Sequence, residues 1–323
     1  MGSRRARVRL QLRELGTGDP GVHEPSAGEC ALRESSSGAG AARFRWVVGR
    51  SVPRCPFQDE AAWRVVLGNR RIERRGVLLS WDDPVRAGDV IVHVHPDTVE
   101  PAVSTDIRVI FEDEHLLAVD KPAPLPVHPS GRFNKNTLVP LLSAVRPDLT
   151  LRPGHRLDME TTGCLVMAKS RRAGNALREQ FERREVEKVY LARVLPAPTE
   201  EHFLCELSIG RETCAAGTRR VRRQGLDART EFQLEKRFSD GSALLRVRPR
   251  TGRTHQIRLH LKSLGYPVVG ERRYESGSVS DVPLCLHAAS LRLRHPTSDA
   301  TLVLETAPPT WAMGAARPLD SSD

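Results

Sequence analysis

The stretch His155–Gly163, HRLDMETTG, places several polar side chains beside one another, directly before the apolar run CLVMA. A Pro-Gly turn precedes it, so Arg156 and Asp158 are predicted to lie on a loop at the mouth of a strand. Catalytic side chains often lie on such loops, where a rigid scaffold positions them. A single loop aspartate is more often a turn residue or a helix cap, so a chemical role for Asp158 requires a second group of residues.

The segment Arg250–His260, RTGRTHQIRLH, is such a second group. Its pattern predicts a turn and then a helix, with Arg253 at the helix start, where its guanidinium can pair with a nearby carboxylate. Tyr190, on the predicted strand EKVYLARV, can lie against a flat ligand. An aspartate oriented by an arginine, beside a tyrosine ring, suits a nucleophile or a base that acts on a nucleobase or a sugar. Spacing alone does not show that these segments meet.

The composition narrows the class of partner. The chain of 323 residues has a net charge of +10 and an isoelectric point near 9.8, which favours polyanions over neutral small molecules. Aromatic residues make up only 5%, which argues against recognition by stacking on many rings. No apolar run approaches the roughly 18 residues that a membrane span needs. The 6 cysteines form no CxxC pair, so we expect reduced thiols that pack as small apolar side chains.

Four parts are predicted along the chain. Residues 1–43 form a basic, largely flexible arm, because they are rich in Arg, Gly, Ser and Ala and poor in bulky apolar residues; targeting to an organelle is the minor alternative. Residues 44–100 form a small α/β extension that either binds RNA or only packs against the rest. Residues 101–308 form the main domain, and 309–323 form a flexible tail.

The main domain alternates strands with helices and reads as α+β, with a large, mixed, mainly antiparallel sheet flanked by helices. IRVIFEDEHLLAVDKP predicts a strand hairpin with acidic turn residues. GCLVMAKS predicts a buried strand that leads to a helix capped by Ser170. Residues 254–264 predict a second helix with an apolar stripe. The stripes of the two helices consist of Ala173, Leu177 and Phe181, and of Ile257, Leu261 and Leu264.

Four motifs in order resemble the RluA-type RNA pseudouridine synthases, which carry an HRLD motif. They are HRLD-x-x-T-T-G, EK-x-Y-x-A, R-T-G-R-T-H-Q-I-R-x-H and L-x-L-H-A-x-x-L-x-x-x-H-P. DKPAPLPVHPSGRFNKNTL and FRWVVGRSV, with EPAV between them, resemble the eukaryotic subgroup that modifies uridine 32 in the anticodon loop of transfer RNA. The resemblance covers 44–296 and implies the pseudouridine synthase fold.

The resemblance assigns catalytic roles to Asp158, Tyr190 and Arg253. Asp158 matches the aspartate that attacks the target uridine, by either of two disputed routes, so that the base detaches, turns and rejoins the sugar through carbon 5. Tyr190 matches the tyrosine that packs against the target base. Arg253 is matched to the arginine that forms an ion pair with the aspartate.

Substrate-binding roles fall to His155, Arg156, Ile257 and Arg258. Arg156 matches the arginine that fills the gap left by the flipped nucleotide, a role that suits a planar cation better than lysine. Ile257 matches an apolar residue on the floor of the base pocket. The resemblance implies no cofactor and no metal, and the histidines in the motifs lack ligand spacing.

These observations favour an enzyme that isomerises uridine to pseudouridine in RNA. Transfer RNA is the substrate that the motifs favour. We expect a monomer without a membrane or metal partner, in the cytoplasm, with the mitochondrion and the nucleus as the other compartments. The alternatives are a synthase of ribosomal or mitochondrial RNA, and a non-catalytic RNA-binding or ribosome-assembly protein on the same fold. Loss of Asp158, Tyr190 or Arg253 would mark the non-catalytic protein, and all three are present.

The basic cluster Arg219–Arg223, RRVRR, has two interpretations. It is either a solvated loop or a contact for RNA phosphates. The basic charge of the whole chain favours the RNA contact.

Overall fold

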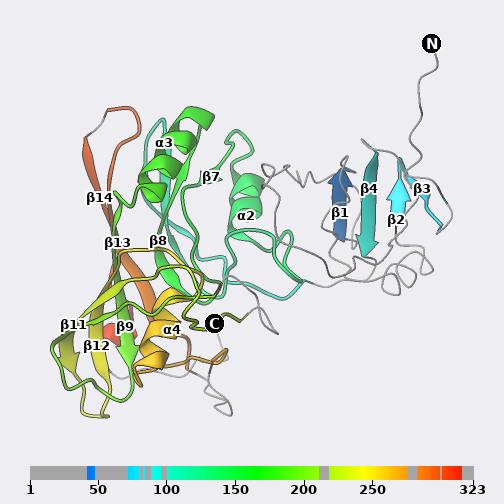
Figure 1. The fold of residues 1–323 in the computed structure, drawn as a ribbon. Helices are drawn as coiled ribbons and strands as arrows, with labels where there is room; N and C mark the ends of the chain where they lie inside the picture. The colour runs from blue at the N-terminus through cyan, green and yellow to red at the C-terminus, as the bar shows by residue number, and fades with distance from the viewer. Residues whose placement is uncertain are drawn as a thin grey trace. The chain divides into compact units, whose positions relative to one another are not determined.

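A computed structural model of the chain divides it into two compact units, Met1–Val99 and Glu100–Asp323 (Figure 1). The structure describes residues 42–47, 72–80, 83, 89–95, 100–210, 218–274, 282–298 and 300–314.

The N-terminal unit contains a sheet of four antiparallel strands among its described residues. Ile72 and Ile91 are buried there. The helix predicted within this extension lies outside the described residues, and RNA binding by the unit stays a prediction. In spatial order the strands are β1 (Ala42–Val47), β4 (Val90–His95), β2 (Ile72–Arg74) and β3 (Val77–Leu78).

The C-terminal unit is built on a 10-stranded sheet among its described residues. Only β8 and β13 of these described strands pair in parallel, which confirms the α+β prediction of a mixed, mainly antiparallel sheet. In spatial order the strands are β10 (His202–Cys205), β11 (Thr230–Arg237), β12 (Ala243–Pro249), β9 (Glu187–Val194), β13 (Leu286–Arg294), β8 (Thr162–Ala168), β6 (Leu116–Lys121) and β5 (Arg108–Glu112), while β14 (Thr301–Glu305) pairs with β13 and β7 (Arg152–Pro153) pairs with β8.

The central strands are buried on both faces, which explains their continuous apolar runs. Successive side chains of a strand point to opposite faces. In β8, Leu165 and Met167 therefore join one hydrophobic cluster, whereas Cys164 and Val166 join another. Cys164, Cys205 and Cys285 are buried free thiols, which confirms for these three the predicted packing role; the other cysteines lie outside the described residues.

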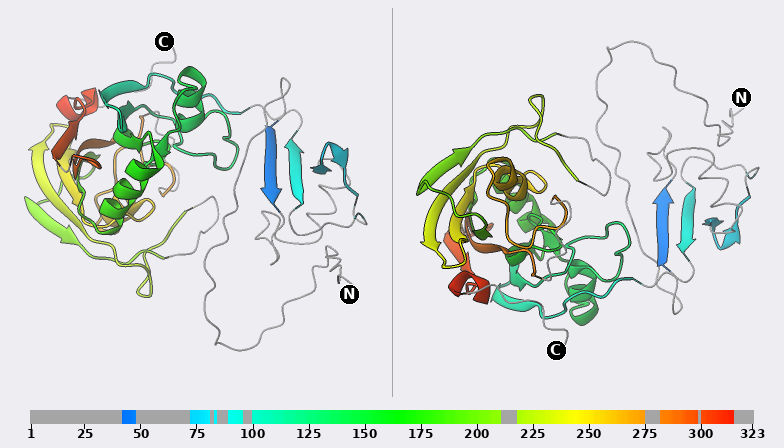
Figure 2. Two further views of the ribbon diagram at one scale, coloured as in Figure 1. Left: turned by 90° about the horizontal axis from the view of Figure 1, so that it is seen from above. Right: turned by 90° about the horizontal axis from the view of Figure 1, so that it is seen from below.

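Helices cover the two faces. The first cluster includes side chains of α2 (Leu138–Val145), α4 (Gln256–Ser263) and α5 (Thr310–Met313), and the second includes those of α3 (Arg171–Glu182). The predicted cap of α3 is confirmed, because the Ser170 hydroxyl accepts a hydrogen bond from the Ala173 N–H at 3.2 Å. Figure 2 shows the curvature of the sheet beside these helices from above and below.

Two predicted boundaries need correction. The tail was predicted to begin at 309, but Trp311 and Ala312 of α5 are buried in the main core. A buried arginine, Arg193, donates a hydrogen bond to the Trp311 carbonyl at 3.0 Å and ties α5 to the sheet. The sequence near α5 did not indicate this docking, because the docking depends on contacts with a strand that is distant in the chain. At the other end, β1 begins inside the predicted arm; residues 1–41 and 315–323 lie outside the described residues.

The glycine of the HRLD motif has a steric role at the parallel pairing. Gly163 has φ +109°, and a Cβ there would lie 2.3 Å from the Ala288 carbonyl oxygen of β13. Only glycine fits both the backbone angle and this close approach. The loop that carries Asp158 is thereby held against β13.

Gly163→Ala is expected to destabilise the protein by about 2–4 kcal/mol, through backbone strain and overpacking. Denaturant unfolding measures the change. Gly265→Ala is the matched control, because Gly265 also has positive φ (+85°) but a Cβ there meets no atom within 4 Å. Equal losses from the two substitutions would contradict the role of the β8–β13 approach.

Candidate active site

A buried lysine holds the loop that carries Asp158 in place. Lys121, at the end of β6, donates hydrogen bonds to the carbonyls of Leu125 at 2.9 Å and Met159 at 3.3 Å. Burial lowers the pKa of Lys121 to about 7, against the opposing charge of Asp158. The lysine thus fixes the backbone next to Asp158 from a strand that lies 38 residues earlier in the chain.

The second loop of the site, ahead of α4, is organised by one buried amide. The side-chain amide oxygen of Gln256 accepts hydrogen bonds from the Thr251 hydroxyl at 2.7 Å and from the backbone N–H of Arg253 at 3.0 Å. Its amide nitrogen donates to the Thr230 hydroxyl of β11 at 2.9 Å. The RTGRTHQ motif therefore folds as a tight loop pinned to the sheet, and α4 begins directly after it.

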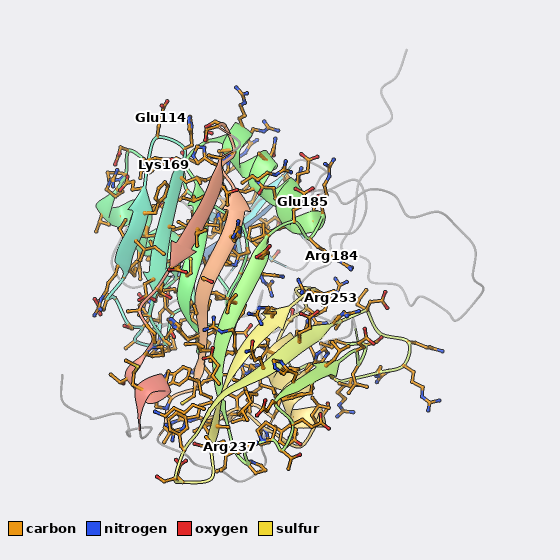
Figure 3. The ribbon with its side chains drawn as sticks, turned by 90° about the vertical axis from the view of Figure 1, so that its left-hand side faces the viewer. Glu114, Lys169, Arg184, Glu185, Arg237 and Arg253 are labelled. Atoms are coloured by element: carbon orange, nitrogen blue, oxygen red, sulfur yellow. The ribbon has the colours of Figure 1, made fainter. Side chains whose placement is uncertain are left out.

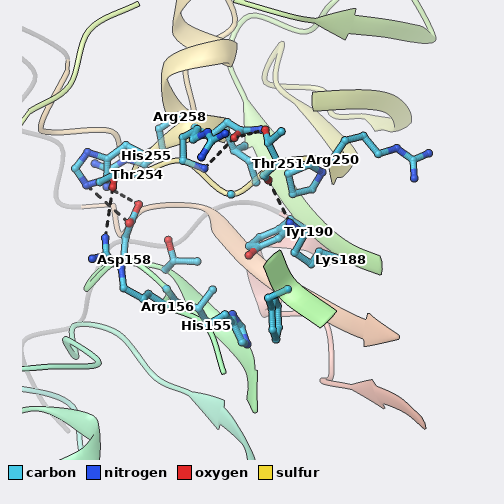
Figure 4. Close-up of a pocket in the computed structure, with 18 of the residues that line it drawn as sticks. His155, Arg156, Asp158, Lys188, Tyr190, Arg250, Thr251, Thr254, His255 and Arg258 are labelled. Atoms are coloured by element: carbon cyan, nitrogen blue, oxygen red, sulfur yellow. Dashed lines mark hydrogen bonds and ion pairs between the residues drawn. The ribbon is translucent and has the colours of Figure 1, made fainter. Parts of the chain in front are cut away.

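The two loops enclose a cavity of about 660 Å³, which lies within the range of roughly 300–1,000 Å³ usual for ligand pockets (Figure 4). All the residues predicted for the site line this cavity. They are His155, Arg156, Asp158, Tyr190, Arg253, Ile257 and Arg258.

The arginine that faces Asp158 is Arg258, so the predicted ion pair with Arg253 is wrong. Arg258 Nη1 lies 3.5 Å from Asp158 Oδ2, and the Arg258 side chain is 1% exposed. Its guanidinium also forms a bidentate pair with the buried Glu271, at 2.6 Å for each bond, and lies 3.3 Å from Glu160. Burial alone would lower the pKa of Arg258, but Glu271, Asp158 and Glu160 together raise it above its ordinary value.

Arg253 lies at the mouth of the cavity instead. Its Nε donates to the Asp227 carbonyl at 3.0 Å, and its side chain is on the same side of the unit as Arg184 (Figure 3). Arg253 was assigned to the ion pair wrongly because the exact start of α4 decides which arginine turns inward. The motif contains both arginines, and α4 starts only at Gln256, so Arg258 lies inside the helix while Arg253 stays in the loop.

Tyr190 and Ile257 form apolar surface within the cavity. Tyr190, on β9, is 9% exposed and Ile257, in the first turn of α4, is 6% exposed. Burial, and then the charge of Asp158, raise the pKa of the Tyr190 hydroxyl well above its usual range. Tyr190 therefore keeps its proton and presents a ring and a hydroxyl to a bound base.

His155 and Arg156 lie next to each other in the chain but play different parts. The His155 ring stacks on Phe181 of α3 at 4.9 Å, and burial lowers its pKa to about 3. It is thus a neutral packing residue at the cavity wall. Arg156 is exposed, and its guanidinium lies 3.4 Å from the Thr254 hydroxyl across the cavity mouth (Figure 4).

Several residues of the site were missed from the sequence. Lys188 lines the cavity and donates to the Thr251 carbonyl at 3.2 Å; burial lowers its pKa to about 8. Glu160 ends the segment HRLDME, and Glu271 lies directly before two arginines in the segment GERRY of residues 270–274, so an acid close to arginines in the sequence was the available signal. Together with Arg184 and Arg250, the lysine makes the rim of the cavity basic.

Other kinds of site find no support in the part of the chain that the structure describes. No group of three or more His, Cys, Asp or Glu side chains is arranged there to hold a metal ion. None of the helices described is both long and apolar enough to cross a membrane.

Comparison with known proteins gives consistent matches. The family model described as RNA pseudouridylate synthase matches residues 115–263. A human protein named pseudouridylate synthase RPUSD2 is 36% identical over 215 residues, which cover 67% of this chain but only 38% of that protein. A protein of Aquifex aeolicus, named an uncharacterized RNA pseudouridine synthase, is 37% identical over 246 residues, which cover 70% of this chain and 78% of that protein.

A solved structure supports the fold. The human RNA pseudouridylate synthase domain containing 1 aligns with a TM-score of 0.54 and 27% identity, over 65% of this chain and 87% of that one. The residues matched by the family model lie in the unit that contains the cavity.

Proposed function

The chain belongs to the RluA-type RNA pseudouridine synthase family, and on this premise we propose that its cavity isomerises uridine to pseudouridine in RNA. The observation that carries the proposal is the position of the Asp158 carboxylate, beside Arg258 and the Tyr190 ring, in a cavity with a basic rim. The experiment is tritium release from RNA that contains uridine labelled at carbon 5. Release by the wild-type protein is expected, and its absence with every cellular RNA would leave the non-catalytic binding protein as the alternative.

The reaction exchanges one bond of the base for another. The bond between N1 of uracil and C1′ of the ribose breaks, and a bond between C5 and C1′ forms; the proton on C5 is lost and N1 gains one. Asp158 acts as the nucleophile and Arg258 holds its carboxylate. Tyr190 supplies the face against which the detached base turns. Because atoms and electrons balance within the substrate, the step needs no cofactor.

Arg156 is the group that would replace the flipped nucleotide. A uridine in structured RNA must leave its stack before it enters the cavity, at a cost of a few kcal/mol. Arg156 is exposed at the mouth and has a planar cation that stacks and contacts phosphate. We therefore assign it to the gap in the RNA and not to the chemical step.

The RNA substrate that we propose is transfer RNA, with uridine 32 of the anticodon loop as the target. The motifs shared with the eukaryotic subgroup support this choice. A map of pseudouridines in total RNA from cells with and without the gene tests it. Loss at position 32 is expected, and loss only in ribosomal or mitochondrial RNA would replace transfer RNA as the substrate.

We also propose that the protein works as a monomer in the cytoplasm. Size measurement by light scattering tests the first part, and imaging of a C-terminally tagged chain tests the second. A mitochondrial or nuclear signal would move the substrate to the RNA of that compartment.

The basic cluster Arg219–Arg223 is proposed to bind RNA phosphates. Arg220→Gln with Arg223→Gln is expected to weaken RNA binding and to reduce the steepness of its salt dependence by about 0.7 in the log–log slope for each phosphate that is no longer neutralised. Filter binding of transfer RNA between low and physiological salt measures both. Lys236→Gln with Arg237→Gln, on β11, removes the same charge elsewhere and is the control; equal slopes for the two variants would contradict phosphate binding by the cluster.

A further inference from the structure

A tyrosine and a histidine connect the basic cluster to the catalytic carboxylate. The backbone N–H of Arg219 donates to the Tyr274 hydroxyl at 3.1 Å, and that hydroxyl lies 2.6 Å from His255 Nδ1. The other ring nitrogen, His255 Nε2, lies 3.8 Å from Asp158 Oδ1. The chain of contacts therefore runs from the backbone of the cluster, through two side chains, to the nucleophile.

The hydrogen-bond pattern selects one tautomer of His255. Because the Tyr274 oxygen accepts the Arg219 N–H, its own hydrogen is available to Nδ1, which then accepts. A neutral His255 consequently carries its proton on Nε2, and this N–H faces Asp158. The carboxylate can only accept, so its position favours the same tautomer. Burial lowers the pKa of His255 and outweighs the charge of Asp158, which acts to raise it. The lowered pKa favours the neutral ring.

Packing holds this connection in place. Ile209 and Ala228, on either side of the basic cluster in the chain, pack with Leu259 of α4, and the Tyr274 side chain lies against them. The Tyr274 ring also lies 5.7 Å below the Arg258 guanidinium. His255 is the residue before α4 and has a left-handed backbone, φ 56°. Both groups that face Asp158 therefore lie at one end of α4, against which residues that flank the basic cluster in the chain are packed.

We propose that Tyr274 is a positioning residue, which fixes the tautomer of His255 so that its Nε2–H orients the Asp158 carboxylate, and which links that orientation to the basic cluster. Arg258 holds Oδ2 and His255 holds Oδ1, so each oxygen has its own N–H partner. The distances of 3.5 and 3.8 Å are long for hydrogen bonds, as is common before a substrate closes the site. RNA phosphates bound at the cluster would steady the Arg219 backbone and so the nucleophile.

The charged and titratable groups around His255 come from several segments, and Tyr274→Phe removes the Tyr274 hydroxyl but leaves the other groups in place. The substitution keeps the ring that packs against Arg258 and removes only the hydroxyl. Tyr266→Phe is the matched control, because Tyr266 packs in the main core through its ring. The groups around His255 are Asp158, Arg258, Glu271, Arg273 and Tyr274.

The test reads the tautomer directly and does not depend on activity. In long-range ¹H–¹⁵N spectra of the full chain labelled at histidine, His255 is assigned by the signal that disappears in His255→Asn. Wild type and Tyr266→Phe are expected to show the proton on Nε2, and Tyr274→Phe to show a mixture of tautomers. A proton on Nδ1 in the wild type, or the same single tautomer in Tyr274→Phe, would overturn the proposal.

A kinetic arm, which rests on the proposed function, separates positioning from folding. Tyr274→Phe is expected to lower the single-turnover rate on transfer RNA by about 10- to 100-fold, because a small misplacement of a reacting group has effects of this order. RNA affinity is expected to stay within about twofold. An unchanged rate beside an active wild type would refute the inference alone; a wild type without turnover would refute the proposed function, while the spectra still decide on Tyr274.

Discussion

Replacing Asp158 by asparagine is expected to abolish pseudouridine formation while RNA binding survives within a few-fold. The substitution keeps the shape of the side chain but removes the charge and the nucleophilic oxygen, so turnover should fall by at least about 10³-fold. Asp158 lines the cavity with a side chain only 23% exposed, and as an anion it does not attract phosphates. Tritium release and filter binding, on the same transfer RNA transcript, measure the two effects.

The comparison with Arg156→Ala makes this result specific. Without the cation at the cavity mouth, flipping becomes harder, so binding to structured RNA should weaken more than binding to an unstructured strand. The Asp158 variant should not make that distinction. If Asp158→Asn released tritium at the wild-type rate, the assignment of the nucleophile would be wrong.

Replacing Arg258 by methionine is expected to damage both stability and catalysis. The variant leaves Glu271 buried without its bidentate partner, and the loss of one member of a buried ion pair costs about 3–5 kcal/mol. It also removes the charge that faces Asp158, so turnover should fall by about 10²–10³-fold. Denaturant unfolding and single-turnover kinetics measure the two losses.

A double variant separates the two roles of Arg258. In Arg258→Met with Glu271→Met the unpaired buried carboxylate is gone, so most of the stability should return. Turnover should stay low, because Asp158 still lacks its cation. Recovery of turnover together with stability would show that Arg258 acts only through folding.

Arg253→Met is the matched control for the corrected ion pair. Arg253 is half-buried, and its guanidinium donates to a backbone carbonyl at the cavity mouth and does not contact the nucleophile. We expect little change in stability and a modest loss in RNA affinity. A loss of turnover as large as that of Arg258→Met would restore the assignment made from the sequence.

Local pattern was sufficient for much of the fold. Alternation and apolar runs marked the hairpin of β5 and β6 and the buried β8, and one hydroxyl before an amphipathic stretch marked the start of α3. The hairpin and the start of α3 depend on contacts between residues close in the chain, and the apolar run of β8 reflects its burial between β6 and β13. The docking of α5 could not be read in this way, because Trp311 is buried by strands and by Arg193, far away in sequence.

The candidate site also has features that follow from the sequence and features that depend on contacts between distant residues. By itself the sequence determined which residues were available for chemistry, namely Asp158, Tyr190 and two arginines within RTGRTHQIR, because motif order and residue type are properties of the chain. Only the tertiary structure decided which arginine faces the carboxylate. The start of α4 turns Arg258 inward, and Glu271 fixes it there, since a buried cation is stable only where hydrogen-bond acceptors or opposite charges surround it.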